Sequence, residues 1–181
     1  QEALEVVSAT ALDVVSTYVA TSSVGAGPFA APPEHSPRAV STIPPFDLQM
    51  AQWQTLSPET KRIGIVTGPR SRPFVGELKN ATEALEQTLT HIEVDSDKEA
   101  LIAFRAMVPH IDGFVFFPDP DVLSPDVIRR IMSHALKNGI EVLTYNKAIF
   151  KLGAFLHVMP VDGDVADQAI ALVSDPKLRS R

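Results

Sequence analysis

The stretch R-I-G-I-V-T-G-P-R-S-R-P, residues 62–73, decides how the chain folds. Residues 62–67 form a short, mostly apolar run that ends in Gly68-Pro69, a pattern typical of a buried strand followed by a turn. Pro73 can occupy the first turn of a helix, and apolar residues follow it at spacings of three and four as far as Leu89. The sequence therefore predicts a strand, a loop and a helix in direct succession.

The same alternation continues along the chain. Further short apolar runs predict strands at residues 92–94, 112–117, 141–144 and 154–159. Amphipathic stretches between and after them predict helices, the last at residues 164–173, and another short helix at residues 46–56 precedes the first strand. Strands that alternate with helices indicate βαβ units and a parallel sheet. We predict an α/β fold, a doubly wound parallel sheet with the flavodoxin-like strand order 2-1-3-4-5.

The first 45 residues differ in character from the rest. Residues 4–19 carry apolar side chains at helical spacing and predict an amphipathic helix, although their many β-branched residues leave a strand as the alternative. Residues 22–45 are rich in proline, which removes amide donors and fixes φ, so we expect a tether or irregular loop there. The predicted domains are residues 1–45, a helix and Pro-rich segment, and residues 46–181, a single α/β lobe.

Composition excludes several classes of protein. The 181 residues hold 16 Lys and Arg against 22 Asp and Glu, a net charge of −6, which argues against a nucleic-acid or anionic-membrane surface. The absence of Cys excludes disulfides and thiolate metal sites. No apolar segment is long and uninterrupted enough to span a membrane, because charged and polar residues interrupt the longest one, residues 4–24.

Topology places a candidate binding site at one edge of the sheet. In open parallel sheets, ligands bind beyond the carboxyl ends of the strands, at the point where the strand order reverses. For this order, residues 68–73 and 118–121 should border the crevice, and residues 145–147 should lie beside them.

Several side chains in these loops could bind the charged groups of a small ligand. Arg70 and Arg72 could clamp a carboxylate, and Ser71 with nearby helix N-terminal amides could help to bind one. Asp119 or Asp121 could accept hydrogen bonds from an ammonium group. The alternative is that these are solvated turn residues, since Pro-Asp-Pro is also good turn chemistry.

No catalytic or cofactor motif accompanies these residues. The chain lacks a P-loop, an H-E-x-x-H metal motif and a G-x-S-x-G nucleophile elbow. Its five His residues are not at metal-ligand spacing, and we expect each of them on the surface or at a strand edge. We therefore expect neither an enzyme nor a bound metal or cofactor.

Three stretches together resemble a known family. They are L-S-P-E-T-K-R-I-G-I-V (56–66), V-P-H-I-D-G-F-V-F-F-P-D-P-D-V-L-S (108–124) and A-I-F-K-L-G-A-F-L-H-V-M-P-V-D-G-D-V-A-D-Q-A (148–169). In their order and spacing they resemble the ABC-transporter substrate-binding proteins of the uncharacterised, amino-acid-type periplasmic family. The resemblance extends from about residue 43 to residue 173.

This resemblance implies a periplasmic or otherwise exported, two-lobed protein that closes on a small ligand and serves a transporter permease. It implies ligand contacts from the loop that runs from Thr67 to Arg72, from Asp119 with the following Pro120, and from Tyr145 and Asn146. The chain departs from the family pattern at Pro120, where Asn is frequent, and at Asp167, where Gly is usual. Its length suits one lobe, which is typical either of a natural single-lobe relative or of a fragment.

Two main hypotheses follow. The first is a non-catalytic binding module for an amino-acid-like or carboxylate ligand. The second is a scaffold or interaction protein that has lost small-ligand binding. Such a protein could form a homodimer through its N-terminal helix. An enzyme is the weakest hypothesis, because no nucleophile–base pair can be named.

Overall fold

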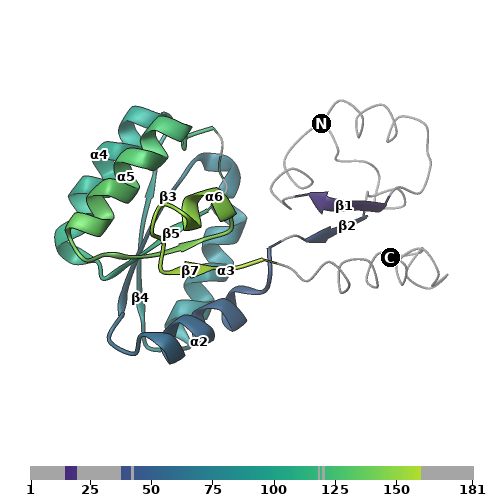
Figure 1. Ribbon diagram of the computed structural model, residues 1–181. Coiled ribbons are helices and arrows are strands. Elements are labelled where there is room, and N and C mark those ends of the chain that lie inside the picture. The colour runs from purple at the N-terminus through teal and green to yellow at the C-terminus, as the bar shows by residue number, and fades with distance from the viewer. Residues whose placement is uncertain (1–14, 20–37, 42, 118, 120, 160–181) are drawn as a thin grey trace. The chain divides into compact units, whose positions relative to one another are not determined.

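The computed structural model describes residues 15–19, 38–41, 43–117, 119 and 121–159. It divides the chain into two units, one formed by Pro45–Val158 and the other by Gln1–Pro44 with Met159–Arg181. The first unit contains a five-stranded sheet with helices on both faces (Figure 1). The expected domain limits, residues 1–45 and 46–181, remain a prediction, because most of the residues at both ends lie outside the described part.

All five strands of the sheet run parallel. In spatial order they are β4 (Thr88–Glu93), β3 (Arg62–Thr67), β5 (Gly113–Phe116), β6 (Glu141–Thr144) and β7 (Leu156–His157). Numbered along the chain, this order is 2-1-3-4-5, so the predicted topology is confirmed. The order reverses between β3 and β5, whose carboxyl ends therefore lie side by side.

Helices cover both faces of the sheet. They are α2 (Phe46–Leu56), α3 (Arg72–Glu83), α4 (Asp97–Met107), α5 (Pro125–Lys137) and the single turn α6 (Lys147–Phe150), with 3₁₀ turns η3 (Pro69–Ser71) and η4 (Val108–His110). α2 packs on α3, and α4 packs on α5 (Figure 1). Gly113 of β5 lies against Trp53 of α2, whereas Gly64 of β3 lies against Met107 of α4, so the two helix pairs cover opposite faces.

The helix predicted from Pro73 to Leu89 ends earlier than expected. α3 stops at Glu83, because Glu86 takes a positive φ of 56° and the Gln87 N–H bonds back to the Thr82 carbonyl at 3.0 Å. Leu89 consequently belongs to β4, which begins at Thr88 and not at residue 92. The start of α5 is as predicted from the sequence, since the Ser124 side chain caps the helix and Pro125 occupies its first position.

The centre of the core is β5. Every residue from Gly113 to Phe116 is buried, and the strand alternates its side chains between the two helix layers. Phe114 meets Phe104 of α4 edge to face, with ring centroids 4.8 Å apart. Val115 lies on the opposite face, on the side of Trp53, which is itself fully buried.

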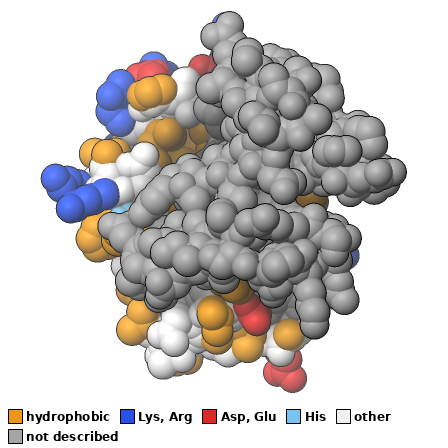
Figure 2. Space-filling model, turned by 90° about the vertical axis from the view of Figure 1, so that its right-hand side faces the viewer, with side chains coloured by type: hydrophobic (Ala, Val, Ile, Leu, Met, Phe, Trp, Pro, Cys, Tyr) orange, Lys and Arg blue, Asp and Glu red, His pale blue; other side chains and the backbone are white. Residues whose placement is uncertain are grey.

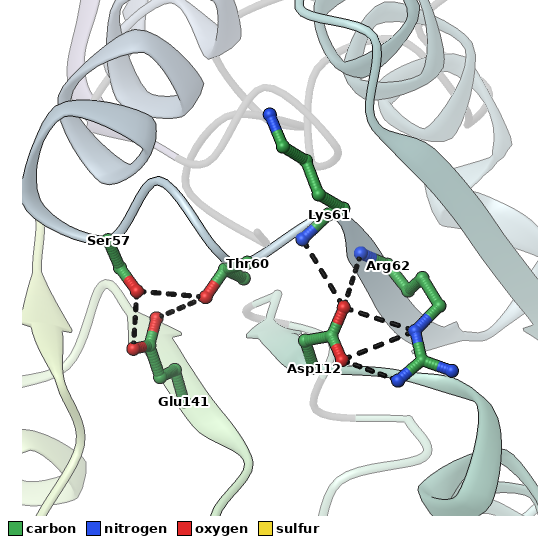
Figure 3. A network of polar contacts seen from close by, with 6 residues as sticks. All are labelled: Ser57, Thr60, Lys61, Arg62, Asp112 and Glu141. Atoms are coloured by element: carbon green, nitrogen blue, oxygen red, sulfur yellow. Dashed lines mark hydrogen bonds and ion pairs between the residues drawn. The ribbon is translucent and has the colours of Figure 1, made fainter.

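A polar network ties the loop between α2 and β3 to the amino-terminal edge of the sheet (Figure 3). The Glu141 carboxylate accepts hydrogen bonds from Trp53 Nε1 at 2.7 Å, Ser57 Oγ at 2.7 Å and Thr60 Oγ1 at 2.8 Å. These bonds give the buried indole N–H a charged acceptor, which is stronger than a neutral one. They hold α2 in its position on the sheet.

Beside it, Arg62 and Asp112 join the first residue of β3 to the residue before β5. Asp112 accepts from the Arg62 guanidinium at 2.6 Å and from the Arg62 backbone N–H at 3.0 Å (Figure 3). The guanidinium holds the pKa of the Asp112 carboxyl below its usual range. The pair fixes the ends of the two central strands.

The second unit shows where the N-terminal prediction was wrong. Val15–Val19 is a strand, β1, which pairs in parallel with β2 (Arg38–Ser41). The helix expected over residues 4–19 is therefore incorrect for Val15–Val19, where β-branched residues and Tyr18 favour the extended chain. The irregular loop expected over residues 22–45 is likewise incorrect at Arg38–Ser41. The helix expected at residues 164–173 lies outside the described residues.

The close contact of β5 with Trp53 predicts opposite effects for two glycine substitutions. A Cβ on Gly113 would lie 2.7 Å from Trp53 Cζ2, whereas a Cβ on Gly76 in α3 would meet nothing within 4 Å. Gly113→Ala should lower the free energy of unfolding by about 1–3 kcal/mol through overpacking. Gly76→Ala should raise it by about 0.5–1 kcal/mol, because Ala loses less entropy in a helix. Urea denaturation of both variants measures this, and equal effects would contradict the packing described.

Candidate functional site

The loops that follow β3 and β5 are joined by the Asp119 carboxylate. Asp119 Oδ2 accepts a hydrogen bond from the Gly68 N–H at 2.8 Å and another from Ser71 Oγ at 2.7 Å. Asp119 and Ser71 are only 5% and 2% exposed, so these bonds lie in the interior. The structure thus brings together two of the residues that the sequence placed at this edge.

Local backbone geometry holds Asp119 in this position. Its carbonyl accepts the N–H groups of Val122 at 3.4 Å and Leu123 at 3.0 Å, which turns the chain immediately after the residue. Gly68 allows the close approach from the other side, since a Cβ there would lie 3.3 Å from both Asp119 Oδ2 and Val122 Cγ1. A larger residue at position 68 would press on the carboxylate.

The second carboxylate oxygen of Asp119, Oδ1, differs from Oδ2 in its hydrogen bonding. Within the described part of the chain, Asp119 Oδ1 accepts no hydrogen bond. A carboxylate that is anchored through one oxygen keeps lone pairs on the other, and these can accept from an ammonium or hydroxyl group. The arrangement is therefore suited to binding a hydrogen-bond donor.

Both arginines of the first loop face carboxylates of the chain itself. Arg70 Nη1 lies 3.3 Å from Asp121 Oδ2, in a pair whose side chains are 61% and 50% exposed. Arg72 binds Glu93 at the end of β4 through two contacts of 2.6 Å. The guanidinium lowers the pKa of the Glu93 carboxyl, and Glu93 in turn raises that of Arg72. Arg72 is thus the more firmly held of the two.

Thr67 pairs with a residue that sequence reasoning did not select. The Thr67 side chain, fully buried at the end of β3, lies 2.9 Å from His91 Nε2. Burial lowers the pKa of His91, and the opposing effect of Glu93 is smaller. His91 is on the edge strand β4, as was expected of a histidine, but a single sequence carries no signal for its contact with Thr67.

An aromatic group surrounds Phe117 at the same edge of the sheet. Its ring centroid lies 5.1 Å from that of Phe74, 6.2 Å from Tyr145 and 6.4 Å from Phe46. The Tyr145 hydroxyl donates to Gln49 Oε1 at 2.6 Å, and burial raises its pKa above the usual range. Phe46 and Phe74 were not predicted at the site, because their positions depend on how α2 and α3 pack.

The last two sequence candidates have different surroundings. Asn146 caps α6, because its Oδ1 accepts from the Ala148 N–H at 2.7 Å. Asp121 is an exposed residue and pairs with Arg70. Tyr145 belongs to the Phe117 aromatic group. Among the described residues, Asn146 forms no hydrogen bond with Asp119.

The described residues offer neither a metal-binding group nor a membrane-spanning helix. Among them, no group of three His, Asp or Glu side chains is placed so that it could hold a metal ion. None of the helices in this part of the chain is both long and apolar enough to cross a membrane.

Solved structures with a similar fold include substrate-binding proteins. The Streptococcus pneumonia "ABC domain in complex with L-Trp" superposes with a TM-score of 0.62 at 18% identity, over 81% of this chain and 51% of its own. A ligand-free, open substrate binding protein with adhesive properties from Clostridium difficile gives 0.65 at 15% identity, over 94% and 60%. The chain therefore shares its fold with about half of each of these proteins.

A third example is an amino acid ABC transporter substrate-binding protein from Pseudomonas fluorescens Pf-5, with a TM-score of 0.52 at 14% identity over 83% of this chain and 42% of that one. The chain therefore spans about half the length of these three matched proteins. No protein-family model and no curated protein matches its sequence. The likeness confirms at the level of the fold the resemblance that the sequence predicted.

The contact between His91 and Thr67 predicts a pH dependence of stability. Because burial holds the pKa of His91 in the folded protein below its usual value, the unfolded chain binds more protons near pH 6. The free energy of unfolding should therefore fall as the pH decreases from 7 to 5.5. His91→Gln keeps a hydrogen-bonding side chain but removes the titration, so its stability should change less over this range.

Urea denaturation at pH 7.0, 6.25 and 5.5 measures this difference, and His110→Gln, at an exposed histidine, is the matched control. If His91→Gln loses as much stability as the unsubstituted chain over this range, the half-buried His91 is not responsible.

Proposed function

We propose that the chain is a solute-binding component that recognises a small amino-acid-like ligand without catalysis, at the carboxyl edge of its sheet. The observation that carries this proposal is Asp119, a buried carboxylate held through Oδ2 by Gly68 and Ser71, whose Oδ1 has no hydrogen-bond partner in the described part of the chain. A ligand ammonium group would give Oδ1 a charge-assisted hydrogen bond, which is stronger than a neutral one.

Arg70 is the better candidate for the ligand's carboxylate. Its pair with Asp121 is largely exposed and monodentate, and such pairs contribute about 0–1 kcal/mol, so Arg70 can exchange partners at little cost. Arg72 would have to break two short contacts with Glu93. We therefore assign the main charged contacts with the ligand to Asp119 and Arg70, and Ser71 orients Asp119. Five further residues border the site: Thr67, Arg72, Asp121, Tyr145 and Asn146.

Aromatic residues beside the site support an aromatic side chain on the ligand: Phe117 itself is only 1% exposed, but Phe74 and Tyr145 next to it are half-buried and can contact a ligand. Phe74 and Tyr145 flank Phe117, which directly follows β5 two residues before Asp119. The Streptococcus pneumonia domain of the same fold is in complex with L-Trp. Tryptophan and its relatives are therefore the first ligands to test.

The proposal extends to the location of the protein and to its partner. A chain of about half the length of the matching substrate-binding proteins would contribute one side of a ligand site, and an exported location and a transporter permease as partner would follow from the likeness. One side of a site buries less of a ligand than a closed pocket, so binding by this chain alone should be weak.

The alternative is a scaffold or interaction protein that can form a dimer and no longer binds small ligands. The pairing of Arg70 with Asp121 and of Arg72 with Glu93 favours it, because both cations of the loop are neutralised within the chain. A ligand panel separates the two readings.

A thermal-shift panel with L-tryptophan, tryptamine and indole-3-propionate tests the assignment of Asp119. A ligand at 100 times its dissociation constant stabilises by about 2.7 kcal/mol, which is several degrees for a domain of this size. L-Tryptophan should raise the melting temperature most. Asp119→Asn should abolish the response to tryptophan and tryptamine, because its amide NH₂ replaces the accepting Oδ1 while its carbonyl can still bind Gly68 and Ser71.

Asp126→Asn is the matched control, since Asp126 is an exposed residue that pairs with Arg130 on α5. It should respond like the unsubstituted chain. No response to any of the three compounds would favour the scaffold, and an undiminished response of Asp119→Asn would remove Asp119 from the site.

A further inference from the structure

One surface of the Pro45–Val158 unit exposes several large apolar side chains close together. We call it the α6 surface; it consists of the end of α5, α6, and the segment that leads into β7. Its apolar members are 42–52% exposed, and they are Leu136, Phe150, Leu152 and Phe155. A Cβ on Gly153 would lie 3.2 Å from Leu136 Cδ1, and the Phe150 ring stacks on His157 at 5.5 Å, so these segments are in contact.

The same surface is positively charged in a chain whose net charge is negative. The end of α5, α6 and the segment into β7 carry three lysines, whereas the whole chain has a net charge of −6; the remaining charged residues of α5 are Asp126, Arg129 and Arg130, of which Asp126 and Arg130 form an ion pair. The three lysines of the α6 surface are exposed and form no ion pair with the described residues, and they are Lys137, Lys147 and Lys151.

Figure 2 shows this mixture on its left edge, which corresponds to the near side of Figure 1, where α6 and β7 lie. Hydrophobic side chains there lie among Lys or Arg side chains, and an acidic side chain adjoins the Lys or Arg group at the upper left.

We propose that the α6 surface binds an anionic lipid surface. Phe150, Leu152 and Phe155 would enter the boundary between headgroups and acyl chains, and Lys147 and Lys151 would contact the anionic headgroups. Phe and Leu combined with Lys are typical of proteins that lie on membranes. The cores of protein–protein interfaces are instead depleted in Lys and enriched in Tyr, Trp and Arg, so the composition favours lipid over a protein partner.

The net charge of the chain does not oppose this binding at physiological salt. The Debye length is then about 8 Å, so acidic residues on distant elements are screened from the membrane, while lysines at the contact are not. Composition alone predicted no attraction to anionic membranes, because it averages this surface with the acidic remainder of the chain.

Sedimentation of the full chain with sucrose-loaded vesicles tests the proposal. The chain should bind vesicles of 60% phosphatidylcholine and 40% phosphatidylglycerol, bind pure phosphatidylcholine vesicles at least tenfold more weakly, and dissociate as salt increases. Lys151→Glu with Leu152→Ser should weaken binding at least fivefold, since each lysine near such a surface contributes about fivefold. Both side chains are exposed, so the fold should tolerate the change.

The matched control is Lys98→Glu with Ile102→Ser on α4, which makes the same changes at an exposed lysine and an apolar residue that is 67% exposed. It should bind like the unsubstituted chain. Failure to bind the anionic vesicles would overturn the proposal and favour an acidic protein as the partner of this surface. Equal losses in the two double variants would also overturn it, because binding would then depend on overall charge alone.

Discussion

Strand β5 is buried on both faces, and the rest of the Pro45–Val158 unit is arranged around it. Its neighbours β3 and β6 pair with it in parallel, so helices have to cover both sides. Gly113 at its start leaves room for Trp53, which places α2, and Phe114 packs against Phe104, which places α4. The Glu141 carboxylate then satisfies the indole N–H, so the packing leaves no unpaired donor there.

The candidate site is a direct consequence of the same strand. The chain that leaves β5 turns at Asp119, beside the end of β3, because the strand order reverses between these two strands. Gly68 and Ser71 come from the first turn after β3 and hold one carboxylate oxygen. A rigid, buried strand thereby positions one acidic group accurately, while the more exposed Arg70 and Asp121 beside it remain adaptable.

The sequence was informative where local patterns determine structure. Short apolar runs between turn residues predicted the strands, and topology then placed Ser71 and Asp119 at one edge. It could not predict which partner each charged residue chooses: Arg72 binds Glu93 because the register of β3 with β4 sets Thr67 opposite Glu93. The helix predicted at Val15–Val19 was also wrong, because β-branched residues at helical spacing are compatible with both a helix and a strand.

The central claim is that a ligand's amino group binds Asp119 Oδ1. A titration of the ¹⁵N-labelled chain with L-tryptophan, followed by NMR, tests it most directly, since it detects even weak binding residue by residue. The account predicts progressive shifts of the Gly68 and Ser71 backbone amides, which adjoin the carboxylate, with the Trp53 indole N–H at the opposite edge of the sheet unchanged. Shifts confined to the Trp53 side, or none near Gly68 at saturating ligand, would contradict it.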